Sequence, residues 1–138
     1  MKRIRKSMFA AAIVSIVTFG GGAAFGADVK LKLSGANEVP PVTTSASGAG
    51  TISVADDGSV SGSVTTKGVQ GTAAHIHMGV AGKNGPVVVP FTKDGDAFKA
   101  PAGAKLDADQ MKAFKAGGLY FNVHSAANPG GELRAQLK

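Results

Sequence analysis

Hydrophobic and polar residues alternate through most of the chain, which is the pattern of half-buried β-strands. In the first run, Val29, Leu31 and Leu33 alternate with two lysines. Similar or wholly apolar runs follow, with Gly, Asp, Asn and Pro between them, at residues 49–55, 60–64, 72–78, 86–91, 119–124 and 132–137. Such short runs between turn residues predict an all-β protein, an antiparallel β-sandwich or barrel of seven or eight strands.

One segment breaks the alternation and predicts a short helix over residues 107–116. Asp107 is a suitable N-cap, with Gln110 three residues later to complete a capping box. Met111 and Phe114 are expected as its buried pair. A helix of fewer than three turns suits a cap over one end of the sandwich.

The N-terminal segment has the composition of a secretory signal peptide. A basic start precedes an apolar stretch at residues 8–19, and a small-residue tail allows cleavage after Gly26 or Ala27. This stretch is shorter than the roughly 20 residues that span a bilayer. We therefore expect a signal peptide at residues 1–27 and a mature domain at 28–138, periplasmic or secreted, with no stable membrane anchor after cleavage.

Composition narrows the function of the mature domain. It holds eleven basic and nine acidic residues, because four of the fifteen Lys and Arg lie in the signal segment. With a net charge of only +2, one Tyr and no Trp, it lacks the basic stripe and stacking platforms of nucleic-acid binding. The chain has no cysteine, so neither a disulfide nor a thiolate ligand is available.

Histidines carry the candidate chemistry. His75 and His77 flank Ile76 in one predicted strand, so both imidazoles project from one face, about 6–7 Å apart. His124 ends the run at residues 119–124, on the face opposite its apolar residues. If these strands meet in one sheet, the three imidazoles converge and can bind one metal ion. The alternative is a polar surface whose histidine nitrogens are satisfied by neighbours.

The ligand type indicates which metal to expect. Three imidazoles suit Cu(II), Zn(II) or Ni(II), and the affinity order at nitrogen sites favours copper, with zinc as the alternative. Around the ligands we expect Glu132 or Arg134, across from His124, together with Asn122 and Glu38. An exposed salt bridge on the last strand and a solvated loop carboxylate are the alternatives for the charged members of this set.

Several motifs in combination resemble the chordin (CHRD) domain family. They are Glu38-Val39-Pro40-Pro41-Val42, Ala74-His75-Ile76-His77-Met78-Gly79, Tyr120-Phe121-Asn122-Val123-His124 and Asn128-Pro129-Gly130-Gly131-Glu132-Leu133-Arg134. The resemblance covers essentially the whole mature chain. It implies an extracytoplasmic all-β domain of an immunoglobulin-like or Greek-key kind and leaves the biochemical function open.

The order of the histidines is also similar to the copper side of copper-zinc superoxide dismutase. By position, that resemblance makes His75, His77 and His124 copper ligands and Arg134 an anion-guiding arginine. The sequence departs from that family because the zinc-site ligands, the bridging histidine and the disulfide cysteines are missing. Dismutase activity therefore does not follow from copper binding.

Three functions of different kinds are consistent with the sequence. The first is an exported metal-binding β-domain for metal storage, delivery or sensing. The second is a non-catalytic extracellular interaction or structural module, with a protein partner or a second copy of the chain. The third is a weak dismutase-like oxidoreductase. The pattern offers no general base beside the histidines, so no catalytic residue is assigned and binding is favoured over catalysis.

Overall fold

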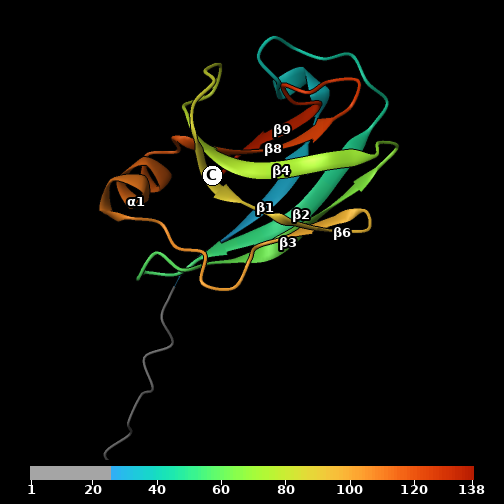
Figure 1. Ribbon diagram of the computed structural model, residues 1–138. Helices are drawn as coiled ribbons and strands as arrows, with labels where there is room; N and C mark the ends of the chain where they lie inside the picture. Colours follow the sequence, from blue (N-terminus) through green and yellow to red (C-terminus); the bar gives the residue numbers. More distant parts are fainter. Residues whose placement is uncertain (1–25) are drawn as a thin grey trace, which may run out of the picture.

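A computed structural model describes residues 26–138 as two antiparallel sheets packed face to face (Figure 1). One sheet has the strand order β1 (Ala27–Leu33), β2 (Ser47–Val54), β3 (Val60–Lys67), β7 (Ala97–Lys99) and β6 (Thr92–Asp94). The other has the order β5 (Val87–Pro90), β4 (Gly71–Met78), β8 (Leu119–Ser125) and β9 (Leu133–Gln136). The predicted β-sandwich is confirmed.

Helical segments are short. A 3₁₀ turn (Gly35–Asn37) follows β1, and α1 (Ala108–Lys115) connects β7 to β8 at one end of the sheets (Figure 1). The predicted capping box is present: Asp107 Oδ1 accepts from the Gln110 amide at 2.8 Å, and Gln110 Oε1 accepts from the Asp107 amide at 2.9 Å. Met111 and Phe114 are only partly buried, not fully as predicted, because α1 packs against the sandwich from outside.

The described residues form nine strands, not the seven or eight predicted. The difference lies at residues 92–99, for which the sequence predicts no strand. The structure places two three-residue strands, β6 and β7, around Gly95. Strands this short show no alternation in the sequence, yet β7 brings the fully buried Phe98 into the core.

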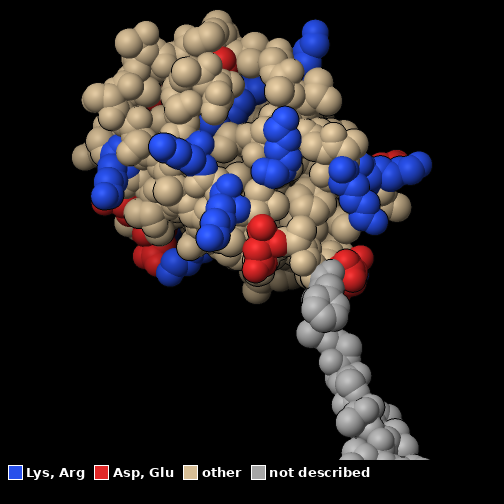
Figure 2. All heavy atoms as spheres, turned by 180° about the vertical axis from the view of Figure 1, so that it is seen from behind, with Lys and Arg blue, Asp and Glu red and all other residues tan. Residues whose placement is uncertain are grey.

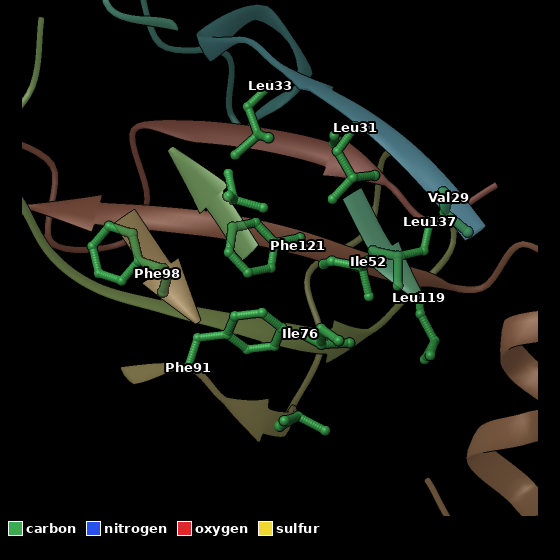
Figure 3. Packing of buried hydrophobic residues seen from close by; sticks show 14 of the residues in the cluster. Val29, Leu31, Leu33, Ile52, Ile76, Phe91, Phe98, Leu119, Phe121 and Leu137 are labelled. Carbon is green, nitrogen blue, oxygen red and sulfur yellow. The ribbon is translucent and has the colours of Figure 1, made fainter. Parts of the chain in front are cut away.

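The hydrophobic core lies between the sheets, where side chains from both point toward one another (Figure 3). Leu31 and Ile52 come from one sheet and Ile76 and Phe121 from the other, each with 4% or less of its surface exposed. The rings of Phe91 and Phe121 meet edge to face, with centroids 5.0 Å apart. Burial of each large apolar side chain contributes about 1.5–3 kcal/mol, so the interior is the main source of stability.

Strands far apart in sequence are neighbours at the centre of the four-stranded sheet. β4 and β8 pair antiparallel, with His75 opposite Asn122 and His77 opposite Tyr120. A register shift near the start of β4 places His124 opposite Ala73. The two predicted histidine strands therefore do meet in one sheet.

The predicted signal peptide lies almost entirely outside the described residues. Only Gly26 and Ala27 of that segment are described, and Ala27 already belongs to β1, where it pairs with Val54. Within residues 26–138, neither length nor hydropathy equips any helix to span a bilayer.

Candidate metal centre

The three histidines project from the outer face of the four-stranded sheet and converge. Ala74 and Ile76 point into the core and are fully buried, so alternation directs His75 and His77 outward. His124 joins them from β8, and one ligand nitrogen from each of the three rings lies within 4.8 Å of the others. These are all the histidines of the sequence.

Two backbone carbonyl groups fix the tautomers of two histidines. His77 donates from Nδ1 to the Gly85 carbonyl oxygen at 2.9 Å, and His124 donates from Nδ1 to the Pro129 carbonyl oxygen at 2.8 Å. A carbonyl oxygen can only accept, so each Nδ1 carries the hydrogen and each Nε2 presents a lone pair. His75 Nδ1 lies 3.1 Å from His124 Nε2 and donates to it.

The spacing of the nitrogens is close to that of a metal site. With Zn–N bonds of about 2.0–2.1 Å, two ligand nitrogens on one ion lie at most about 4.2 Å apart. In the tetrahedral arrangement typical of Zn(II) the separation is about 3.3 Å, so nitrogens at the 4.8 Å limit in the structure have to approach by about 1.5 Å. Binding therefore requires side-chain rotations in which His75 gives up its contact with His124.

The surroundings favour neutral imidazoles. Burial lowers the pKa of His75, and the adjacent His124 and His77 lower it further. Burial also lowers the pKa of His77, although its hydrogen bond to Gly85 opposes the change. Neutral imidazole is the form that binds metal, so both rings are held in the ligating state near neutral pH.

A stack of side chains supports His77. Its ring lies parallel to the ring of Tyr120 at a centroid distance of 4.8 Å, and the Arg134 guanidinium covers the other ring face of Tyr120 at 3.8 Å. Arg134 Nε donates to Glu38 Oε1 at 3.2 Å in an ion pair whose side chains are each only 3% exposed. The structure therefore places Arg134 and Glu38 beside the site, acting through Tyr120.

The segment between β4 and β5 lies against this stack. Arg134 donates to the Lys83 carbonyl oxygen at 2.9 Å and to the Asn84 side-chain oxygen. The Gly85 amide donates to the Tyr120 hydroxyl at 3.0 Å. A side chain at Gly85 would place its Cβ 1.6 Å from the Met78 carbonyl oxygen, so only glycine fits. This close approach positions the Gly85 carbonyl that orients His77.

Tyr120 and Gly85 are functional neighbours that the sequence prediction missed. Tyr120 shares its strand face with His124, and that alternation was the available signal. Nothing local to Gly85 indicates that its carbonyl accepts from a histidine eight residues earlier, because the contact depends on the fold of the intervening loop.

Glu132 lies in a different network. Its carboxylate accepts from Ser125 at 2.7 Å, from Thr44 at 2.8 Å and from the Asn128 side chain at 3.1 Å. These contacts hold the loop before β9 against the segment before β2. Of the four residues expected around the ligands, Glu132 thus has its carboxylate engaged by these three partners, and its role around a metal ion stays a prediction.

Arg134 is not placed to guide anions toward the histidines. Only 2% of its surface is exposed, and its guanidinium is engaged by Glu38, Lys83 and Asn84. The feature that the dismutase resemblance implied for this arginine is therefore replaced by a structural role.

The fold and this face together define an all-β sandwich domain with a histidine cluster on one outer surface. The family model described as the CHRD domain matches residues 29–137, and the chain belongs to this family. CHRD domains are typically extracellular. No curated protein and no solved structure matches the chain.

Proposed function

We propose that His75, His77 and His124 bind one divalent transition-metal ion, copper in preference to zinc, in an exported domain that stores, delivers or senses the metal. The observation that carries the proposal is the convergence of all three histidines with their nitrogens within 4.8 Å. The choice of metal follows from the nitrogen donors, for which Cu(II) lies above Zn(II) in the affinity order.

The state of His77 supports the proposal. Its Nε2 atom is buried and has no hydrogen-bond partner. A buried polar atom without a partner destabilises a fold by about 1–3 kcal/mol. A metal ion on the Nε2 lone pair would remove that cost.

Binding fits the site better than catalysis does. Arg134, whose charge acts on His77, is buried in an ion pair with Glu38, so neither residue is free to transfer protons. We therefore propose a binding domain, and superoxide turnover is expected to be absent even when copper is bound.

Calorimetric titration of Cu(II) and Zn(II) into the tag-free protein tests the proposal. Loss of an outer partner of a metal ligand typically lowers affinity 10–100-fold, so His75→Ala and His124→Ala should each lower it more than about 100-fold. Lys30→Ala, on the opposite outer face, is the matched control and should bind like the wild type.

The variant His77→Ala is a less specific probe of metal binding than the position of His77 on a polar face suggests. His77 is only 8% exposed and stacks on Tyr120, so its removal also leaves a packing defect. The half-buried His75 and His124 are therefore the decisive variants.

Equal binding by the wild type and these variants would overturn the metal proposal. The interaction module would then be the better account. Val80 and Val87, 56% and 51% exposed at the two ends of the β4–β5 segment, would be the apolar contacts to test first.

A further inference from the structure

Two buried side-chain atoms in residues 26–138 have no hydrogen-bond partner, and both belong to the histidine face: His77 Nε2 and Asn122 Oδ1. Asn122 is only 2% exposed and lies directly opposite His75 across the β4–β8 pair. It stands between Tyr120 and His124 on the same face of β8. The two partnerless atoms are thus neighbours in one small region.

The amide orientation of Asn122 has a physical reason. A Cβ atom built on Gly131 would lie 2.6 Å from Asn122 Nδ2 and 2.2 Å from Glu38 Oε2. The amide nitrogen and the carboxylate oxygen therefore face the same small space at Gly131. The reverse orientation would set the amide oxygen against the carboxylate. Nδ2 therefore lies on the Glu38 side of Asn122, and Oδ1 lies on the other side, from which the side chain acts on His77.

Asn122 is also close to His77. Its side chain acts to raise the pKa of that histidine, against the larger effect of burial. His77 Nε2 presents a lone pair, because Nδ1 carries the hydrogen donated to Gly85. Asn122 Oδ1 is likewise an acceptor only. Two buried acceptors side by side are stabilised by a cation or by a donor such as water between them.

We infer that Asn122 Oδ1 is a fourth, oxygen ligand of the metal ion held by the three histidines. This inference rests on the proposed function and completes the donor set as three nitrogens and one oxygen. Such a set contains no soft sulfur donor, so it suits divalent Cu(II) or Zn(II) and disfavours Cu(I). The site would then take up copper in its oxidised form.

Asn122→Leu is the principal test, because leucine has a similar volume and no oxygen. Zn(II) and Cu(II) affinities should fall about 10–100-fold. The Cu(II) electron paramagnetic resonance spectrum should change its parallel hyperfine splitting while the signature of three nitrogens stays. The thermal midpoint of the metal-free protein measures the structural part of the change, because leucine removes both the partnerless acceptor and the amide nitrogen on the Glu38 side. A merely structural role for Asn122 would change only that midpoint and leave the metal affinities and the spectrum as in the wild type.

Asn122→Asp is the companion variant. It keeps an oxygen at the same position, so Zn(II) affinity should be retained or increased. If an aspartate beside Glu38 prevents folding, a measurement on the wild-type protein still tests the fourth ligand. The side-chain carbonyl carbon of Asn122, followed by NMR, should shift when Zn(II) is added to the unmodified protein.

The outcomes separate this inference from the proposed function. If the wild type binds neither metal, the proposed function fails and this inference fails with it. If the wild type binds but Asn122→Leu keeps the same affinity and spectrum, and the carbonyl carbon does not shift, only the fourth ligand is overturned. A water between Asn122 and His77 then accounts for both partnerless acceptors.

Discussion

The two outer faces of the sandwich carry polar side chains in opposite environments. On the five-stranded sheet, Lys30, Thr51, Ser63 and Lys99 lie in one row across four strands and face solvent. Figure 2, which views the molecule from behind, shows Lys and Arg side chains spread over the visible face, with Asp and Glu mainly near its lower edge. On the four-stranded sheet, Tyr120, Asn122 and Arg134 are each only 2% exposed, and His124 and Gln136 are half-buried.

The difference comes from the loops and not from the strands. Both faces have the same alternation of apolar and polar positions. Only on the histidine face do the segments carrying Glu38 and Asn84 lie over the sheet, joined by the Asn84 side chain, which donates to the Val39 carbonyl oxygen at 2.9 Å. Alternation along a strand therefore determines which face of the sheet a side chain occupies, whereas the packing of loops over that face determines whether it is accessible to solvent.

The largest expected effect is on the buried ion pair. Glu38→Gln removes one charge and leaves Arg134 buried without its counter-ion, so the free energy of unfolding should fall by about 3–5 kcal/mol. Urea denaturation measures the change. On the solvent-exposed face of the five-stranded sheet, Asp94→Asn breaks the exposed ion pair of Asp94 with Lys99, whose charged atoms are 2.7 Å apart. This variant should have no measurable effect on the free energy of unfolding. Similar losses in both variants would show that the two faces do not differ.

A smaller effect is expected at Glu132, with a defined dependence on pH. Burial alone would raise the pKa of Glu132, but hydrogen bonds from Ser125, Thr44 and Asn128 lower it below 4.5 overall. The unfolded chain therefore binds the proton more readily, and the stabilisation is present above pH 4.5 and lost as the pH falls through the folded pKa. Glu132→Gln should cost about 1.5–2 kcal/mol at pH 7.

Unfolding free energies of the wild type and Glu132→Gln, measured from pH 7 to pH 3, provide the check. The two curves should approach each other in acid. A constant gap at all pH values would mean that the carboxylate charge is not what these hydrogen bonds stabilise.

The histidine face should respond to pH in a higher range. The lowered pKa values of His75 and His77 mean that the unfolded chain binds more protons just below pH 6.5. Stability of the metal-free protein should therefore fall as the pH drops from 6.5 toward the folded pKa values. In His75→Ala this dependence should be weaker, measured by thermal unfolding in the presence of a chelator. An unchanged pH profile in that variant would contradict the assignment.

The smallest effect is expected on the solvent-exposed face of the five-stranded sheet. Lys30→Gln should change the free energy of unfolding by no more than about 0.5 kcal/mol, because the side chain remains in solvent in the folded state. Chemical denaturation is sufficient to measure this. A loss of more than 1 kcal/mol would place Lys30 in a role that its exposure does not indicate.

Much of the histidine cluster was predictable because it depends on alternation within strands. His75, His77 and His124 lie on the expected face, and β4 and β8 pair as expected. The stack through Tyr120 and the carbonyl of Gly85 were not predictable, because they depend on how a loop packs over the sheet. The hydrogen bonds that engage the Glu132 carboxylate were not predictable either, because Thr44 and Asn128 lie on loops.

The strand count was missed for a different reason. β6 and β7 have three residues each, and their pairing follows from the turn at Gly95 and from the burial of Phe98. Such short pairs are stabilised by the neighbouring β3, to which β7 is bonded. A strand that is stabilised mainly by its neighbour is therefore hard to predict from its own residues.

The core lies on the opposite side of β4 and β8 from the histidines, and this separation has a consequence for cargo exchange. In small zinc-dependent folds the metal supplies the folding free energy, and its removal unfolds the chain. Here the apolar interior would hold the sandwich together whether or not an ion occupied the face. An ion could be loaded and surrendered repeatedly without cycles of unfolding, which is the behaviour that a carrier or reversible reservoir requires.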